Sequence, residues 1–213
     1  MATRNQLNPP PLRKITDFKS KLSGGGARSN LFECELAFPP AVNVEGLNDI
    51  LNKARFLVKA ANLPASNVAP IEVPFRGRVL KIAGDRTFDT WTITVINDTD
   101  FAIRSSFERW MNSMAKVSDT SGNTNPADYT RDASVYQLGR SAVAPNSQES
   151  AQNMPILRTY KFYDIWPTTI DEIALSYDTG DAIEEFGVTF KVQYFTIGNS
   201  TQSSGSGGEV LIS

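Results

Sequence analysis

The sequence between residues 74 and 114, PFRGRVLKIAGDRTFDTWTITVINDTDFAIRSSFERWMNSM, carries the clearest structural pattern in the chain. In its middle, Trp91, Ile93 and Val95 alternate with threonines, which is typical of a strand with one buried face. After Asn97-Asp98, apolar side chains recur at helical spacing and predict an amphipathic helix with Asp100 or Thr99 as its N-cap. The apolar positions are Ile103, Phe107, Trp110, Met111 and Met114. We expect four residues to pack in the core: Trp91, Ile103, Phe107 and Trp110.

The residues ahead of this strand contain two charged candidate turns. Residues 73–83 are predicted as a strand or tight hairpin interrupted at Gly77, with Arg76 and Arg78 on one face. The next turn is expected at 84–86. A phosphate contact and a subunit contact both suit such arginines, and the subunit contact is the favoured interpretation. The candidate contact residues here are Arg76, Arg78, Asp85 and Arg86.

The remaining elements are predicted from similar patterns. Strands are expected at 31–38, 55–63, 134–138, 158–166, 172–177 and 185–197, with a helical turn at 44–51 and loops at 64–70, 116–131 and 143–153. The last strand is expected to place Phe186, Val188, Phe190, Val192 and Tyr194 on one face, after a hairpin turn at 178–181. The predicted fold is mainly β: two packed antiparallel sheets, sandwich-like or barrel-like, with one principal α-helix. It should be a single domain of residues 31–198.

The composition excludes several classes of site. A chain of 213 residues with 40% hydrophobic and 21% charged residues is ordinary for one globular domain. The absence of histidine removes Ser-His-Asp and Cys-His catalysis and the usual zinc ligands. The single Cys34 permits no internal disulfide and is expected to lie inert in the core. We therefore expect no catalytic residues, no cofactor and no metal, and neither a secretory signal nor a membrane span.

Charge is distributed unevenly along the chain. Residues 1–30 contain six basic side chains and one acidic one, and they form a Pro-rich and Gly-rich arm, whereas 199–213 form a Gly/Ser-rich tail. The arm's candidate contact residues are Arg13, Lys14, Lys19 and Lys21. Residues 162–190 contain seven acids and no Lys or Arg. A calcium loop or a glycosidase pair is conceivable there, but solvated acids in turns are favoured.

The order of several motifs closely resembles the tail tube protein family of contractile-tailed bacteriophages over roughly residues 30–198. The motifs are AANLP at 60–64, EVPFRGR at 72–78, KIAGDRTF at 81–88, Trp91-Thr92, Asn97-Asp98, RSSFERW at 104–110 and YKFYDIWP at 160–167. The resemblance implies subunits that pair edge to edge in six-membered rings, which stack into a tube that conducts DNA. It implies a virion protein rather than an enzyme. It also implies assembly in the host cytoplasm and four partners: the sheath, the baseplate, a tape-measure protein and a tail terminator.

Two hypotheses compete for the acidic residues of the predicted tube subunit. In one, part of the block lines the lumen, where carboxylates would repel DNA phosphates. The candidate lumen residues are Glu172, Asp178, Asp181, Glu184 and Glu185. In the other, the basic arm lies across an acidic face of an adjacent subunit. Two different functions also stay open: a secretion-system tube subunit of the same fold, and a monomeric β-sandwich ligand-binding module.

Overall fold

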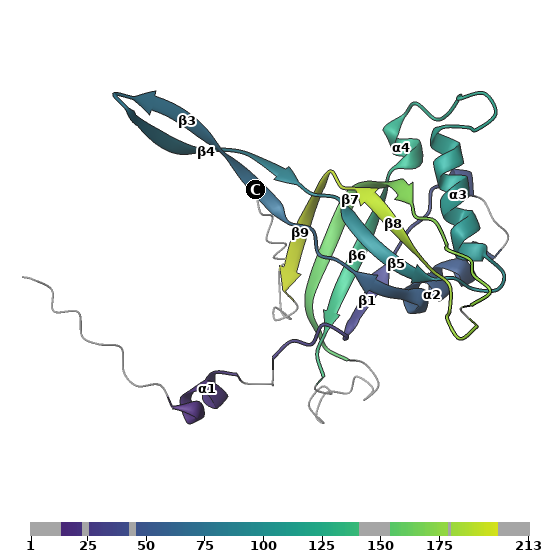
Figure 1. Cartoon of the computed structure of the whole chain (residues 1–213), viewed down its shortest axis with the longest axis horizontal. Helices are drawn as coiled ribbons and strands as arrows, with labels where there is room; N and C mark the ends of the chain where they lie inside the picture. Colours follow the sequence, from purple (N-terminus) through teal and green to yellow (C-terminus); the bar gives the residue numbers. More distant parts are fainter. Residues whose placement is uncertain (1–13, 23–25, 43–45, 141–153, 179, 200–213) are drawn as a thin grey trace, which may run out of the picture.

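The computed structural model describes residues 14–22, 26–42, 46–140, 154–178 and 180–199. They form a body of seven strands and a two-stranded hairpin that extends away from it (Figure 1). The body strands are β1 (Phe32–Glu35), β2 (Val58–Ala61), β5 (Trp91–Ile96), β6 (Arg131–Leu138), β7 (Ile156–Ile170), β8 (Glu185–Lys191) and β9 (Tyr194–Asn199). The hairpin strands are β3 (Ser66–Phe75) and β4 (Arg78–Phe88), and the helices are α1 (Ile15–Lys21), α2 (Leu47–Leu57), α3 (Ala102–Met114) and α4 (Pro126–Tyr129).

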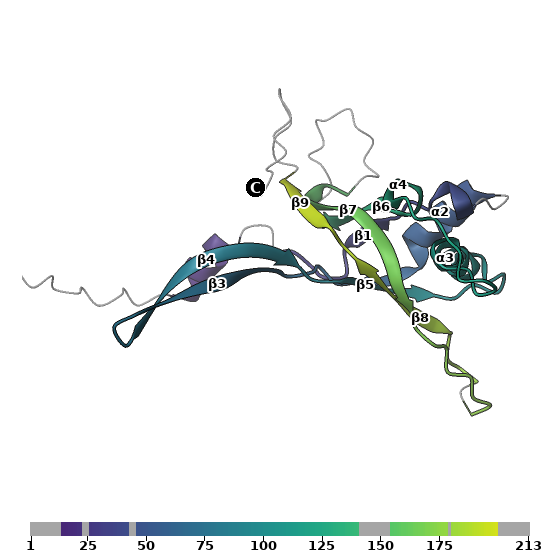
Figure 2. The same ribbon diagram turned by 90° about the horizontal axis from the view of Figure 1, so that it is seen from above.

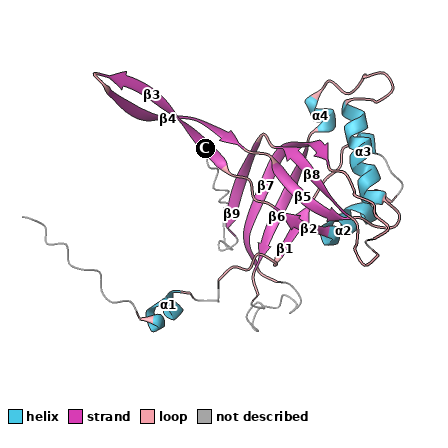
Figure 3. Ribbon diagram, viewed as in Figure 1, coloured by secondary structure: helices cyan, strands magenta, loops and turns pink. Residues whose placement is uncertain are grey.

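The body consists of two antiparallel sheets that share the long strand β7. Tyr160 in the first part of β7 lies opposite Val135 of β6 and Ile197 of β9, whereas the last part of the strand pairs with β8. One sheet therefore has the order β1-β6-β7-β9 and the other β2-β5-β8-β7 (Figure 3). A bulge at Tyr163-Asp164, where Asp164 has a φ of 52°, bends β7 between the two sheets. The mainly β fold with two antiparallel sheets agrees with the prediction.

Aromatic rings fill the space between the sheets and α3. Trp91 stacks on Phe162 with ring centroids 4.6 Å apart and on Phe190 at 5.2 Å. Trp110 of α3 approaches the same Phe190 at 6.1 Å. The four core residues expected from the sequence are at most 2% exposed: Trp91, Ile103, Phe107 and Trp110. The apolar stripe of α3 thus packs on the sheets, because its side chains recur once per helical turn.

Helix α2 occupies residues that were partly expected to form a strand. The helix runs to Leu57 and β2 covers only Val58–Ala61, so the predicted strand at 55–63 is wrong in its first part. Ile50 and Ala54 lie one turn apart and are buried, whereas Phe56 is 86% exposed. The buried positions follow the helical period, which outweighs the short alternation through Phe56 and Val58.

The hairpin is longer than predicted. Strand β3 begins at Ser66, where a loop was expected at 64–70, and β4 continues through the expected turn at 84–86. Prolines 70 and 74 are tolerated because each strand of a two-stranded ribbon has one unpaired edge. The expected turn residues instead lie at a bulge, where the register shifts between Val68 and Pro70. Arg76 lies in the turn itself, so it does not share a strand face with Arg78.

Two predictions near the C-terminal end of the body are wrong. Residues 172–177 form no strand, so a β-hairpin does not span 178–181, of which residue 179 lies outside the described residues. Residues 185–197 form β8 and β9, with a break at Val192-Gln193 where the chain passes from one sheet to the other. The break changes the alternation, because Phe195 is 8% exposed whereas Tyr194 is 40% exposed.

Candidate assembly surfaces

The hairpin β3–β4 is almost fully exposed along both of its strands. It projects from the body in both views of Figures 1 and 2. All residues of β3 are exposed, and in β4 only Gly84 and Phe88 are partly covered. Its two-residue turn consists of Arg76 and Gly77 with φ of 44° and 80°, the geometry of a type I′ turn that suits the twist of the strands. The hairpin is therefore a regular ribbon rather than an irregular loop.

One face of this ribbon is apolar. Ile71 lies opposite Ile82 and Val73 lies opposite Leu80, and residues directly opposite in an antiparallel ladder point to the same face. Phe75 continues the same alternation toward the tip. These five side chains, which we call the hairpin apolar face, are 41–66% exposed. Exposed apolar side chains grouped in this way are typical of a protein–protein contact.

The predicted contact residues of the hairpin and the arm lie in two separate places. Arg76 is in the hairpin turn with its guanidinium 5.3 Å from the centre of the Phe75 ring, and Arg78 opens β4 opposite Phe75. Asp85 and Arg86 lie near the bulge in β4. The arm residues Lys14, Lys19 and Lys21 belong to α1 or directly precede it, and Arg13 lies outside the described residues.

The five acids proposed for the lumen gather between β7 and β8, but they have different surroundings. Glu185 pairs with Lys59 of β2 at 2.5 Å, and Glu184 accepts a hydrogen bond from the side chain of Asn97 at 2.9 Å. The other three acids are exposed and form no ion pair within the described part of the chain: Glu172, Asp178 and Asp181. The loop that connects β7 to β8 also exposes three large apolar side chains: Leu175 is 79% exposed, Tyr177 108% and Ile183 70%.

In the described part of the chain, three strands of the body have one free edge, and the last part of β7, which pairs only with β8, has one too. Among the strands that the structure describes, β1 pairs only with β6, β2 only with β5, and β9 only with β7. A free strand edge presents unpaired N–H and C=O groups that a second chain can bind. These edges and the hairpin are the surfaces through which copies of the chain could join.

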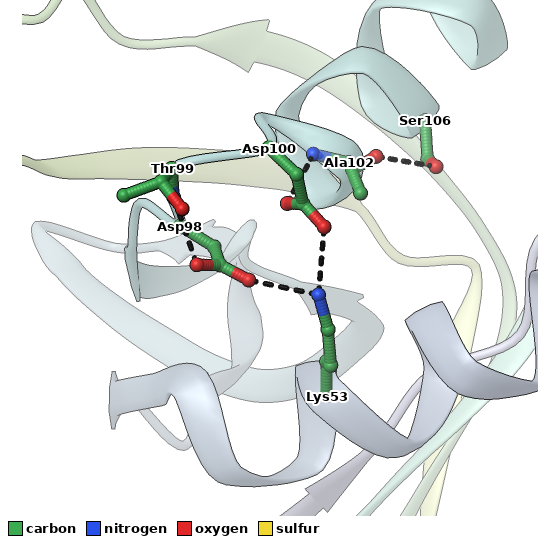
Figure 4. Close-up of polar contacts among 6 residues, drawn as sticks. All are labelled: Lys53, Asp98, Thr99, Asp100, Ala102 and Ser106. Carbon is green, nitrogen blue, oxygen red and sulfur yellow. Dashed lines mark hydrogen bonds and ion pairs between the residues drawn. The ribbon is translucent and has the colours of Figure 1, made fainter.

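The polar contacts at the start of α3 hold the body together. Lys53 Nζ of α2 lies 2.9 Å from Asp98 Oδ2 and 2.7 Å from Asp100 Oδ2 (Figure 4). Asp100 Oδ1 also accepts a hydrogen bond from the backbone N–H of Ala102 at 3.1 Å, although Phe101 rather than Asp100 is the N-cap residue. The hydrogen bonds to Asp100 and Asp98 raise the pKa of Lys53. The charges tie α2 to α3, and this cluster is structural.

A second cluster joins α2 to β1 and β6. The Tyr136 hydroxyl donates to Glu35 Oε2 at 2.7 Å, and Arg55 pairs with Glu35 Oε1. These two partners hold the pKa of Glu35 below its usual value. Next to it, burial raises the pKa of the Cys34 thiol to about 12, so this thiol stays protonated and inert.

Two further observations concern metal binding and membrane crossing in the described part of the chain. The chain has no histidine. Across the described ranges, no group of three or more Cys, Asp or Glu residues could hold a metal ion. No helix in those ranges has the length and hydropathy that a membrane crossing requires.

The fold is similar to chains of contractile injection machines. A chain of the PVC sheath–tube complex in its extended state aligns with a TM-score of 0.52 and 11% identity, over 84% of this chain and 97% of that chain. A chain of the anti-feeding prophage baseplate aligns with a TM-score of 0.55 and 9% identity, over 83% and 98%. At such identities the likeness shows a shared fold.

Sequence comparison identifies the family. The family model described as phage tail tube protein matches residues 27–198. The tail tube protein gp19 of Enterobacteria phage T4 is 32% identical over 173 residues, which cover 81% of this chain and 93% of that protein. A tail tube protein of Serratia phage KSP90 is 24% identical, over 85% and 94% of the two chains. These matches favour a phage tail tube over a secretion-system subunit or a ligand-binding module. The chain therefore belongs to the phage tail tube protein family and is a structural subunit of such a tube.

Proposed function

We propose that copies of this chain join through the hairpin β3–β4 into closed rings of six, and that the rings stack into the tail tube. The observation that carries the proposal is the hairpin apolar face, which leaves five large apolar side chains in solvent. A two-stranded ribbon without a covered face is at best marginally stable in water. Contact with a second copy would cover this face and stabilise the ribbon at the same time.

Ring closure would also satisfy the free edges of the body. The unpaired edges of β1, β2 and β9 invite further pairing, which in a monomer is an aggregation hazard. Head-to-tail contacts that return on themselves pair such edges without leaving open ends. Six copies is the number that the family resemblance implies.

We infer that the tube is a passive conduit rather than an enzyme. The lack of histidine and of a metal-binding group in the described residues supports this role. The tube would belong to the virion and would be assembled in the host cytoplasm without inserting into the membrane. Its partners would be the sheath, the baseplate, a tape-measure protein and a tail terminator. DNA would pass through it without specific binding.

The acidic block could give the lumen its charge. Carboxylates facing the lumen would repel phosphates, whereas each Lys or Arg there would bind DNA and slow its passage. The candidates stay those from the sequence: Glu172, Asp178, Asp181, Glu184 and Glu185. Four of them have no ion pair in the residues that the structure covers, and of these Glu172, Asp178 and Asp181 are exposed, which makes those three available for such a role. A map of the tube with these side chains on the outside would contradict the assignment.

Electron microscopy of the purified chain and a matched pair of variants tests the proposed function. Wild-type protein should form rings or tubes in negative stain. Leu80→Asp places a charge on the hairpin apolar face and should abolish tubes, because burying a leucine side chain contributes about 1.5–3 kcal/mol and a buried unpaired charge costs more. The single chain should melt at an unchanged temperature, since Leu80 is 60% exposed.

Val79→Asp is the matched control. Val79 lies next to Leu80, is 53% exposed, and points to the opposite face of the ribbon, opposite Pro74. The control should still form tubes. Small discrete particles from the wild type would contradict the tube function. Equal assembly of both variants would contradict the role given to the apolar face.

A further inference from the structure

Helix α1 is too short and too exposed to be stable on its own. It spans Ile15–Lys21, has no buried residue, and the hydrogen bonds described for it stay within residues 14–22. Isolated helices shorter than about 12–15 residues are marginal in water. Its Ile15, Phe18 and Leu22 lie at helical spacing and are 67%, 60% and 46% exposed. A helix with these properties needs a surface that covers its apolar side.

The surface that binds α1 must be apolar and acidic. The helix and its flanks carry Lys14, Lys19 and Lys21 against the single Asp17. The hairpin apolar face does not suit it, because residues 66–88 contain four basic and two acidic side chains. Like charges brought together across a contact oppose binding. The family match begins at residue 27, so α1 lies outside the residues that the family describes.

The loop between β7 and β8 has both required properties. Its residues line an open hollow of about 670 Å³, with residues 172–177 on one part of the wall and residues 182–185 on the other. Leu175, Tyr177 and Ile183 line it and are largely exposed. No Lys or Arg occurs anywhere in residues 162–190. The exposed acids of this loop that have no ion pair in the described ranges include Glu172, Asp178 and Asp181.

Within one chain, α1 and the β7–β8 loop lie on different sides of the body. In Figures 1 and 2, α1 lies apart from the body, and the loop extends from the opposite side of it. We propose that α1 of one copy lies in the β7–β8 hollow of a second copy. Phe18 would pack against Leu175 and Tyr177, and the lysines would face the unpaired carboxylates. The inference rests on the proposed assembly, since it needs several copies in contact.

Disulfide trapping between two singly substituted chains tests this contact. One chain carries Phe18→Cys and the other Leu175→Cys, and tubes are assembled from the mixture with oxidised glutathione as the oxidant. The native Cys34 is 1% exposed and should not react. The mixed tubes should yield disulfide-linked dimers on a non-reducing gel. A control mixture with Val117→Cys, which is 94% exposed at a different place, should yield none.

A second measurement gives the strength of the contact. Phe18→Ser should raise the free-subunit concentration in equilibrium with tubes by about ten- to a hundredfold, the loss expected for one buried aromatic side chain. Lys19→Glu and Asp181→Lys should each weaken tube assembly. A chain that carries both changes exchanges the two charges, and it should recover part of the assembly that each single variant loses. If tubes form without the disulfide-linked dimers, or if Phe18→Ser does not weaken tube assembly, the α1 contact is refuted but the proposed tube function is not. A chain that forms no tubes would contradict the proposed function as well.

Discussion

Replacing Trp110 by alanine should destabilise the single chain strongly. Trp110 of α3 is completely buried and lies between Phe38 at 5.8 Å and Phe190 at 6.1 Å, measured between ring centroids. Its indole N–H also donates a hydrogen bond to the backbone carbonyl of Tyr129 at 2.7 Å. The residue thus joins α3 to the sheets and to the short helix α4.

The expected loss follows from the packing. Removing a buried tryptophan side chain leaves a cavity and costs about 3–5 kcal/mol in the free energy of unfolding. The substitution also removes the hydrogen bond to the carbonyl of Tyr129. The expected loss in the free energy of unfolding therefore lies toward the upper end of this range. For a domain of this size, each kcal/mol lowers the melting temperature by about 2–4 °C. We therefore expect the Trp110→Ala chain to melt about 6–20 °C lower.

The assay must measure the unassembled chain, because assembly adds stability by mass action. Thermal and urea unfolding should be followed by circular dichroism at concentrations where light scattering detects single chains only. Trp110→Phe is the control, because it keeps an aromatic ring at the position but removes the N–H donor. Its free energy of unfolding should lie between those of the wild type and the alanine variant. An alanine variant that unfolds within 1 kcal/mol of the wild type would refute the packing role assigned to Trp110.

Two further predictions concern ionisable groups. Because burial raises the pKa of Cys34 to about 12, a thiol reagent at pH 8 should not label the folded chain but should label it fully in denaturant, and rapid labelling of the folded chain would contradict its burial. Since the pKa of Glu35 is lowered in the folded chain, its stabilising effect is present at neutral pH and lost as the pH falls through that lowered value. Glu35→Gln should therefore be less stable than the wild type at pH 7, and urea titrations should show the difference closing as the pH falls through the lowered pKa of Glu35. If the stability difference between the wild type and Glu35→Gln were the same at all pH values, the stabilising role of the Glu35 carboxylate would be contradicted.

The elements predicted well are those with one buried and one exposed face within the single chain. Strand β5 alternates from Trp91 to Val95 because it lies in a sheet with one face on the core. Helix α3 repeats its apolar residues every turn for the same reason. In both elements the local sequence records which side is buried, so the pattern is enough.

The hairpin was only partly predicted because neither of its faces is buried within the chain. Both faces of β3 and β4 are exposed here, and a loop was predicted at 64–70, between two prolines. The alternation of Ile71, Val73 and Phe75 was the signal that could have extended the strand. The loop prediction at 64–70 covers the start of β3, where no such alternation of large apolar residues occurs. Strand β9 was misjudged for a different reason: no local pattern records where a chain changes sheets.

The acidic block separates into two parts with different uses. Glu184 accepts a hydrogen bond from Asn97 and Glu185 pairs with Lys59, so both fasten the end of the β7–β8 loop to the body, and the lysine offsets the charge of Glu185. The unpaired acids are left for either the lumen or α1. A surface that only repels DNA would need no apolar side chains, yet Leu175, Tyr177 and Ile183 stand exposed beside those acids. Apolar groups next to unpaired carboxylates match a basic amphipathic helix better than a passing polyanion, and on this ground the contact with α1 is the stronger of the two assignments.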